Sequence, residues 1–212
     1  MNNLEMILFD LDGTLLDTLD ITVETINEVL QKNNLDITVS KTVVENGMGS
    51  SSKEVAQMYM PTLDEEKRMS LLKEMDKARI KRVGEVGGNL YPNLEKVLQN
   101  LKAKYKLAIV SNCGAGYIES FLEYYEFGKY FDDYMAASKY GISKAEAIKT
   151  VIQRNKIEKA IYVGDTPKDA NAANGANIPF IFANYGFGKV ENPEHVINNL
   201  LELEELLNMT NM

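Results

Sequence analysis

The sequence is poor in three residue types that build common functional sites. Among 212 residues it has one Cys, one His and no Trp. A lone thiol, Cys113, excludes a disulfide framework and a cysteine-rich zinc site. A lone imidazole, His195, lies near the end of the chain and far from the motifs described below, so we expect neither a histidine nucleophile nor a Ser-His-Asp triad. The lack of disulfides is typical of a reducing compartment, and we expect a cytoplasmic protein.

Long apolar runs and an excess of positive charge are also missing. No apolar run approaches the about 20 residues that span a bilayer, and the first residues lack the basic and apolar segments of a secretory signal. The chain has 23 Lys and Arg against 31 Asp and Glu, a formal net charge of -8. Because nucleic-acid backbones are bound mostly through Lys and Arg, this balance opposes such binding. We therefore expect neither a membrane nor a nucleic-acid partner.

Short apolar runs alternate with segments of helical periodicity over most of the chain. This alternation is typical of βαβ units, and it predicts an α/β fold with a Rossmann-like parallel sheet and helices on both faces. Proline and capping residues predict helices over residues 92–104, 116–125, 143–155 and 167–175, and a last one that begins near Pro193. The five runs that we predict to be strands are residues 6–9, 107–110, 134–137, 160–163 and 180–183.

A long interruption separates the first predicted strand from the second. Residues 16–88 show no strand pattern, and Leu19, Val23, Ile26 and Leu30 are spaced for one face of a helix. Thr62 followed by Glu65 resembles a capping box for a later helix. We therefore predict a core domain of residues 1–15 and 89–212 that carries an all-helical insert, residues 16–88.

Two features of the insert bear on ligand binding. The stretch of residues 47–52 is rich in Gly and Ser; it either reaches toward a substrate or only connects two helices. A run of basic residues follows, which we interpret as a solvated helix face rather than an anion site. The run consists of Lys73, Lys77, Arg79, Lys81 and Arg82.

Polar residues follow three of the predicted strands, where an open parallel sheet binds its ligands. A single Asp in such a place is often a turn former or a helix cap, but four of them at one edge would repel each other unless a proton or a cation intervenes. Carboxylate clusters of this kind favour Mg²⁺, which prefers oxygen ligands. The residues are Asp10 and Asp12 after the first strand, Ser111 and Asn112 after the second, and Asp165 and Asp169 after the fourth.

These motifs resemble those of the haloacid dehalogenase-like (HAD) hydrolases. The string from Phe9 to Thr18 is similar to the first motif, in the type that carries a helical cap directly after it. Ser111-Asn112 resembles the second motif, Lys144 the third, and the stretch from Gly164 to Asp169 the fourth. The third-motif Lys is often followed by Pro, whereas Ala follows here, and Lys139 and Lys149 lie close by. The resemblance covers nearly the whole chain and indicates a helical-cap phosphatase of the phosphoglycolate phosphatase type.

The resemblance implies a role for each motif residue. Asp10 would be the nucleophile that forms an aspartyl phosphate, and Asp12 the general acid and base. Mg²⁺ would bind to Asp10, to the backbone carbonyl of Asp12 and to Asp165, with Asp169 in support. The residues that would bind the phosphate oxygens are Ser111, Asn112 and Lys144.

Three functions follow in order of preference. The first is a Mg²⁺-dependent phosphatase that acts on a small phosphorylated metabolite. The second, a phosphomutase of the same superfamily, shares all four motifs. The third, a metal-binding regulatory protein of low activity, has no support in the motifs, because every expected catalytic position is present. The sequence leaves the physiological substrate and the oligomeric state open.

Overall fold

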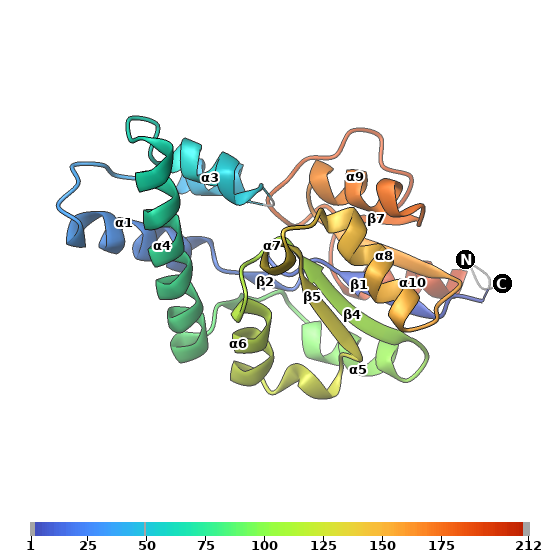
Figure 1. The fold of residues 1–212 in the computed structure, drawn as a ribbon. Helices are drawn as coiled ribbons and strands as arrows, with labels where there is room; N and C mark the ends of the chain where they lie inside the picture. Colours follow the sequence, from blue (N-terminus) through green and yellow to red (C-terminus); the bar gives the residue numbers. More distant parts are fainter. Residues whose placement is uncertain (1–2, 49, 210–212) are drawn as a thin grey trace.

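One parallel sheet forms the centre of the protein. The structure, a computed structural model, describes residues 3–48 and 50–209. Six strands, each parallel to its neighbours, follow the order β5-β4-β1-β6-β7-β8. Figure 1 shows the sheet, with β5 and β4 at one edge. This confirms the α/β fold and the five predicted strands. The strands are β1 (Met6–Phe9), β4 (Lys106–Ser111), β5 (Asp133–Ala136), β6 (Ala160–Gly164), β7 (Phe180–Ala183) and β8 (Val196–Ile197).

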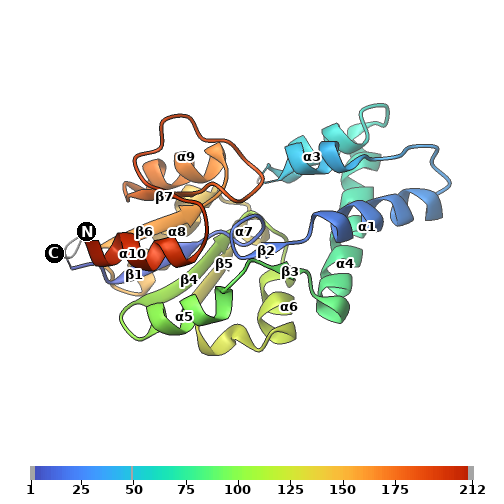
Figure 2. The same ribbon diagram turned by 180° about the vertical axis from the view of Figure 1, so that it is seen from behind.

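Helices cover both faces of the sheet, as the sequence predicts. Successive side chains of a strand point to opposite faces. Accordingly, Ile7 and Phe9 of β1 pack in one hydrophobic cluster with residues of α5 (Leu94–Lys102), α6 (Tyr117–Tyr124) and α10 (Leu201–Met209). Helices α5 and α10 lie in front of the sheet in Figure 2. The opposite cluster holds Met6 and Leu8 with residues of α8 (Lys144–Arg154) and α9 (Pro167–Ala176). The short elements α7 (Ala137–Tyr140) and η1 (Phe127–Lys129) lie on either side of β5 in the sequence.

The insert is almost entirely helical and has a hydrophobic cluster of its own. It contains α1 (Leu19–Lys32), α2 (Lys41–Gly47), α3 (Ser52–Tyr59) and α4 (Glu65–Val86), and its buried residues include Leu30, Val44 and Met60. These helices lie to one side of the sheet in Figures 1 and 2. The last turns of α4 pack on α6, and Val83 joins the cluster of the core.

The expectation of no strand in the insert is wrong at its first residues. β2 (Leu16–Asp17) pairs antiparallel with β3 (Asn89–Leu90), so the chain leaves and re-enters the core through a two-stranded ribbon. Such short strands carry no periodic signal, because they form only where the outgoing and returning backbones meet. The capping prediction is also wrong: α4 begins after Asp64, whose carboxylate accepts a hydrogen bond of 2.8 Å from the Lys67 amide.

The end of the chain differs from its predicted helix near Pro193. Val196 and Ile197 instead pair with Phe182 and Ala183 of β7, and the helix starts only at Leu201. Pairing with the open edge of the sheet therefore overrides the local helical pattern. No helix within residues 3–48 and 50–209 is both long and apolar enough to span a membrane.

The central position of β1 gives a test of the fold. Leu8 is fully buried within the sheet, so Leu8→Ala should lower the free energy of unfolding by about 2 to 5 kcal/mol. Val196→Ala, at a side chain that is 41% exposed on the edge strand, serves as the control and should change it by about 0.5 kcal/mol or less. Urea denaturation measures both, and equal losses would contradict this placement of β1.

Candidate active site

The carboxyl ends of adjacent strands bring three acidic side chains together. Asp10 follows β1, Asp165 follows β6, and Asp169 lies in the first turn of α9. All three are buried, and each offers a carboxylate oxygen within 4.8 Å of the others. We call these three residues the carboxylate cluster. The sequence predicts this grouping, because β1 and β6 are neighbours in the sheet.

Asp169 is fixed by the capping of its own helix. Thr166 caps α9, and its amide and hydroxyl donate hydrogen bonds of 3.0 and 2.5 Å to Oδ2 of Asp169. The other oxygen, Oδ1, accepts a hydrogen bond of 2.6 Å from Nζ of Lys144. The capping box therefore orients this carboxylate as well as starting the helix.

Lys144 is the cation of the cluster. Its Nζ lies 3.1 Å from Oδ1 of Asp10, and its side chain is only 4% exposed. Burial lowers the pKa of Lys144, but the carboxylates of Asp10 and Asp169 outweigh this effect and raise it above its usual value. Lys139 and Lys149 are both exposed, so the structure brings Lys144, and neither of these neighbours, to the carboxylates.

Asp165 is held in a space that only glycines leave open. Its Oδ2 accepts a hydrogen bond of 2.8 Å from the Phe187 amide, and its Oδ1 one of 3.4 Å from the Thr14 hydroxyl. A Cβ on Gly13 would lie 2.1 Å from Oδ2 of Asp165, and Gly13 also has a positive φ of 81°. Any side chain at position 13 would therefore displace this carboxylate.

The cluster has more negative charge than its one ammonium group balances. Burial raises the pKa of Asp10 to about 7; Lys144 opposes this shift and Asp169 adds to it. Burial, with the carboxylates of Asp169 and Asp10, raises the pKa of Asp165 well above its usual value. Oδ1 of Asp10 accepts no hydrogen bond from the described residues, despite its ion pair. Buried oxygen ligands that retain excess negative charge fit Mg²⁺.

Asp12 points away from the cluster and into a separate set of contacts. Its Oδ1 accepts hydrogen bonds from the hydroxyls of Thr18, at 2.8 Å, and Tyr117, at 2.7 Å. Its Oδ2 lies 3.6 Å from Nη1 of Arg79, a residue of α4 in the insert. Sequence patterns do not predict these three partners. One signal points to Tyr117, which follows the strand-end motif of Ser111 by six residues.

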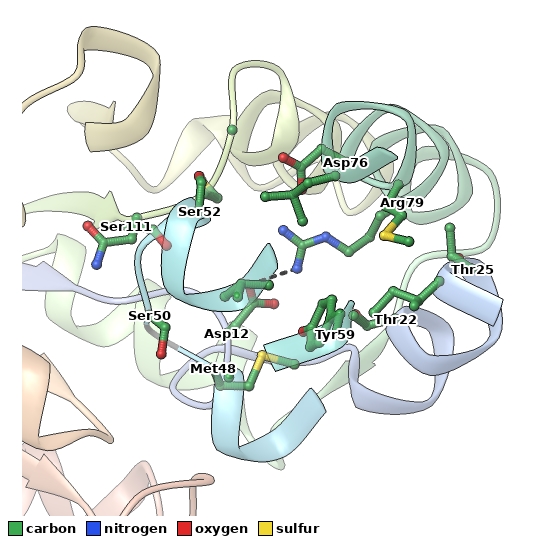
Figure 3. A pocket seen from close by; sticks show the side chains of 18 of the residues that line it. Asp12, Thr22, Thr25, Met48, Ser50, Ser52, Tyr59, Asp76, Arg79 and Ser111 are labelled. Carbon is green, nitrogen blue, oxygen red and sulfur yellow. Dashed lines mark ion pairs between the residues drawn. The ribbon is translucent and has the colours of Figure 1, made fainter. Parts of the chain in front are cut away.

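A cavity of about 90 Å³ lies between the core and the insert. On the core side Asp10, Asp12, Ser111 and Asn112 line it, as Figure 3 shows for Asp12 and Ser111. Ser111 is buried and Asn112 half-buried. Each of the seven predicted site residues therefore has a place in this region. Asp10, Asp165 and Asp169 form the carboxylate cluster, and Lys144 contacts it. The other three, Asp12, Ser111 and Asn112, line the cavity together with Asp10. We call this space the cap cavity.

The Gly- and Ser-rich stretch of the insert contributes to the cap cavity. Gly47, Met48, Ser50 and Ser52 line it, and residue 49 lies outside the described residues. The hydroxyl of Ser50 accepts a hydrogen bond of 2.6 Å from Nζ of Lys168 in the core. The sequence leaves open whether this stretch reaches toward a ligand or only connects two helices. In the structure it connects α2 to α3, and the four residues named above also line the cavity.

The basic run of α4 is not uniformly solvated. Lys73, Lys77, Lys81 and Arg82 are exposed, but the side chain of Arg79 is only 15% exposed and points into the cap cavity (Figure 3). The interpretation of the whole run as a solvated face is therefore wrong at Arg79. Leu72 and Met75 also line the cavity, and they lie seven and four positions before Arg79, on the same helix face.

Cys113 and His195, the one Cys and the one His of the sequence, have no place in the carboxylate cluster. Burial raises the pKa of the Cys113 thiol to about 12, with a further contribution from Asp12, so the thiol stays protonated although it borders the cavity. His195 is not among the residues that line the cavity, and its nearest acidic partner is Glu194 at 3.7 Å. A cysteine or histidine nucleophile therefore finds no support in the described structure.

A Rossmann-like sheet with aspartates at two strand ends, a buried lysine and a helical insert defines a class of α/β hydrolase. Residues 7–183 match the family model described as haloacid dehalogenase-like hydrolase. The chain belongs to this family, as the sequence motifs indicate.

Curated relatives of similar length match almost the whole chain. A phosphoglycolate phosphatase of Vibrio parahaemolyticus is 24% identical and covers 97% of this chain and 96% of its own. One of Aquifex aeolicus is 26% identical, covering 96% of this chain and 97% of its own. Among solved structures, a predicted phosphoglycolate phosphatase of Haemophilus somnus has a TM-score of 0.85 at 20% identity, covering 98% and 99% of the two chains. The last comparison shows a shared fold.

The carboxylate cluster gives a test that does not need catalysis. Mg²⁺ should raise the melting temperature of the protein by several degrees, because a ligand at about 100 times its Kd adds about 2.7 kcal/mol. Asp165→Asn should remove this shift, since it takes away one of the buried oxygen ligands. Asp36→Asn, at an exposed carboxylate of the insert, is the matched control and should keep it. A full shift in Asp165→Asn, measured by differential scanning fluorimetry with EDTA as reference, would disprove the site.

Proposed function

We propose that this protein is a Mg²⁺-dependent phosphatase that hydrolyses a small phosphorylated metabolite through an aspartyl-phosphate intermediate. One observation carries the proposal: Asp10 lines the cap cavity and also borders Lys144 and the other two carboxylates. A nucleophile in this position faces the substrate on one side and a cation site on the other. Family membership and the phosphatase names of the relatives support the same conclusion.

Asp10 would act as the nucleophile. In the first step its carboxylate oxygen attacks phosphorus, and the bond between phosphorus and the ester oxygen breaks. Asp12, which lines the same cavity, gives a proton to the leaving oxygen. In the second step Asp12 takes a proton from water, the water oxygen attacks phosphorus, and the acyl phosphate bond to Asp10 breaks. The products are an alcohol and inorganic phosphate.

The remaining motif residues would bind charge. Asp10 and Asp165, with the backbone carbonyl of Asp12, would hold Mg²⁺, while Asp169 orients Lys144 through its 2.6 Å hydrogen bond. When bound, the cation would neutralise repulsion between the carboxylates and the phosphate. Ser111, Asn112 and Lys144 would donate hydrogen bonds to the non-bridging oxygens, and their preformed positions would favour the transition state.

We also propose that residues 16–88 form a cap domain over a core of residues 1–15 and 89–212. Two observations support this division: the insert has its own hydrophobic cluster, and it meets the core at the two-stranded ribbon of β2 and β3. A cap in this place excludes water from Asp10 and supplies contacts to the leaving group. The reducing compartment expected from the single Cys would be the cytoplasm.

A screen of phosphate monoesters with Mg²⁺ tests the function. Wild-type protein should release inorganic phosphate from at least one small ester, and Asp10→Asn should lose about 10⁴-fold or more of that rate, because the amide is a poor nucleophile. Asp36→Asn should retain the full rate. Release from no ester, or unchanged release by Asp10→Asn, would refute the mechanism. Conversion of a sugar phosphate to its isomer only in the presence of a sugar bisphosphate would instead identify a phosphomutase.

The acid role of Asp12 has its own signature. Asp12→Asn should slow release of the alcohol from an alkyl phosphate by about 10²- to 10⁴-fold in a single turnover. Release of p-nitrophenol from p-nitrophenyl phosphate should slow far less, because that leaving group departs without a proton. Rapid-quench measurements of the first turnover separate this step from hydrolysis of the acyl phosphate. Equal slowing of both substrates would show that Asp12 does not protonate the leaving group.

A further inference from the structure

The insert places one buried cation in the cap cavity. Arg79 is the one Lys or Arg among the described residues that line the cavity. Its guanidinium lies 4.3 Å from the centre of the Tyr117 ring. It donates no hydrogen bond to any residue in the described part of the chain, and its nearest carboxylate oxygen, on Asp12, is 3.6 Å away. A guanidinium with five donors, mostly shielded from water and without hydrogen-bond acceptors, is arranged to receive a ligand.

A second group in the same cavity also lacks a hydrogen-bond partner. Thr22 of α1 lines the cavity and is only 4% exposed. Its hydroxyl is buried and has no hydrogen-bond partner among residues 3–48 and 50–209. Helices α1 and α4 pack against each other, so the Thr22 hydroxyl and the Arg79 guanidinium reach the cavity from adjacent helices (Figure 3). Burying an unpaired hydroxyl costs free energy, and a polar ligand would recover it.

From these two groups, and given the phosphatase function proposed above, we infer that Arg79 and Thr22 bind a carboxylate carried by the leaving group of the substrate. The substrate class is therefore the phosphate esters of short hydroxy acids. Arg79 would form the charge-assisted pair with the carboxylate, and the Thr22 hydroxyl would donate to one of its oxygens.

The charges of the cavity select a carboxylate over a second phosphate. Asp10, Asp12 and Asp76 line the cavity together with Arg79, so its lining is already negative. A carboxylate carries a single charge, which one guanidinium balances, and its two oxygens match the fork of the guanidinium. A phosphate dianion would add a charge that no other described cation of the lining offsets. An uncharged leaving group would give Arg79 no partner except the distant oxygen of Asp12.

The position of Arg79 restricts the length of the hydroxy acid. Asp12 must come within hydrogen-bond reach of the leaving oxygen to protonate it. Since Arg79 lies 3.6 Å from Asp12, a carboxylate bound to Arg79 lies close to that same oxygen. Only a few bonds can therefore separate the carboxylate from the ester. The relatives named as phosphoglycolate phosphatases suggest phosphoglycolate, which has a carboxylate on the carbon next to the ester oxygen, as the first probe.

Two matched probes isolate the carboxylate. Phosphoglycolate and ethyl phosphate share the phosphate ester and the two-carbon chain, and only phosphoglycolate has the carboxylate. We expect wild-type protein to prefer phosphoglycolate by about 100-fold in kcat/KM, the usual scale for a buried charge pair. Arg79→Gln should reduce that ratio to near one, and Arg79→Lys should restore part of it. Thr22→Val should reduce it about tenfold, as expected for one hydrogen bond to a charged group.

A control on the same helix accounts for changes in folding. Arg82→Gln alters an exposed guanidinium of α4, whose nearest carboxylate, Glu24, is 3.9 Å away, and it should leave the preference for phosphoglycolate unchanged. If Arg79→Gln lowers kcat/KM equally for both esters, its role is structural and the inference is overturned. A wild-type protein that hydrolyses ethyl phosphate as well as phosphoglycolate would overturn it too, while leaving the phosphatase function intact.

A binding measurement keeps the inference testable apart from catalysis. Asp10→Asn should hold phosphoglycolate without consuming it, and calorimetry should show affinity about 100-fold higher than for ethyl phosphate. Adding Arg79→Gln to Asp10→Asn should remove that difference. If wild-type protein releases phosphate from no ester, the proposed function fails, and this difference in affinity still decides the role of Arg79. Equal affinities for the two probes would overturn the inference.

Discussion

The charge balance around Lys144 is the constraint on which the rest of the site depends. Three buried carboxyl groups meet where β1 and β6 end, and one ammonium lies 3.1 Å from Asp10 and 2.6 Å from Asp169. Burying charge is favourable only when it is paired, and here the negative charge exceeds the positive. The elements around the cluster limit this cost: the α9 cap satisfies one oxygen of Asp169, and the loop amide of Phe187 satisfies one of Asp165. A divalent cation would complete the balance.

The same scarcity of positive charge bears on the substrate class that we propose. The protein has a net charge of -8, and a phosphate ester of a hydroxy acid is itself strongly negative. Such a ligand enters an acidic cavity only if cations meet both of its ends. In the binding mode that we propose, Lys144 would meet the phosphate end and Arg79 the other end, and the two residues come from different parts of the chain, α8 of the core and α4 of the insert. Recognition of the leaving group would therefore need core and insert together.

Sequence patterns predict the parts of this structure that local chemistry determines. The five predicted strands and the helices between them form because apolar runs fill both faces of a buried sheet, and strand ends place Asp10, Asp165 and Ser111 together. Two-residue strands such as β2 and β8 could not be predicted, since distant backbones create them. The charge of the basic run predicts a solvated face and is wrong at Arg79, because Arg79 shares a helix face with Leu72 and Met75, which is the face that α4 buries.

The contacts of Asp12 connect chemistry to the position of the insert. Its carboxylate is held at once by Thr18, which precedes α1, by Tyr117 of α6 and by Arg79 of α4. Oδ1 is directed at the two hydroxyls and Oδ2 at the guanidinium, so partners from the core and from the insert together fix the direction of this carboxylate. A shift of α4 relative to the core would change the surroundings of Oδ2 first, since Arg79 of α4 is the residue that faces it. The position of the insert and the orientation of the proposed acid are therefore linked through the contact between Asp12 and Arg79.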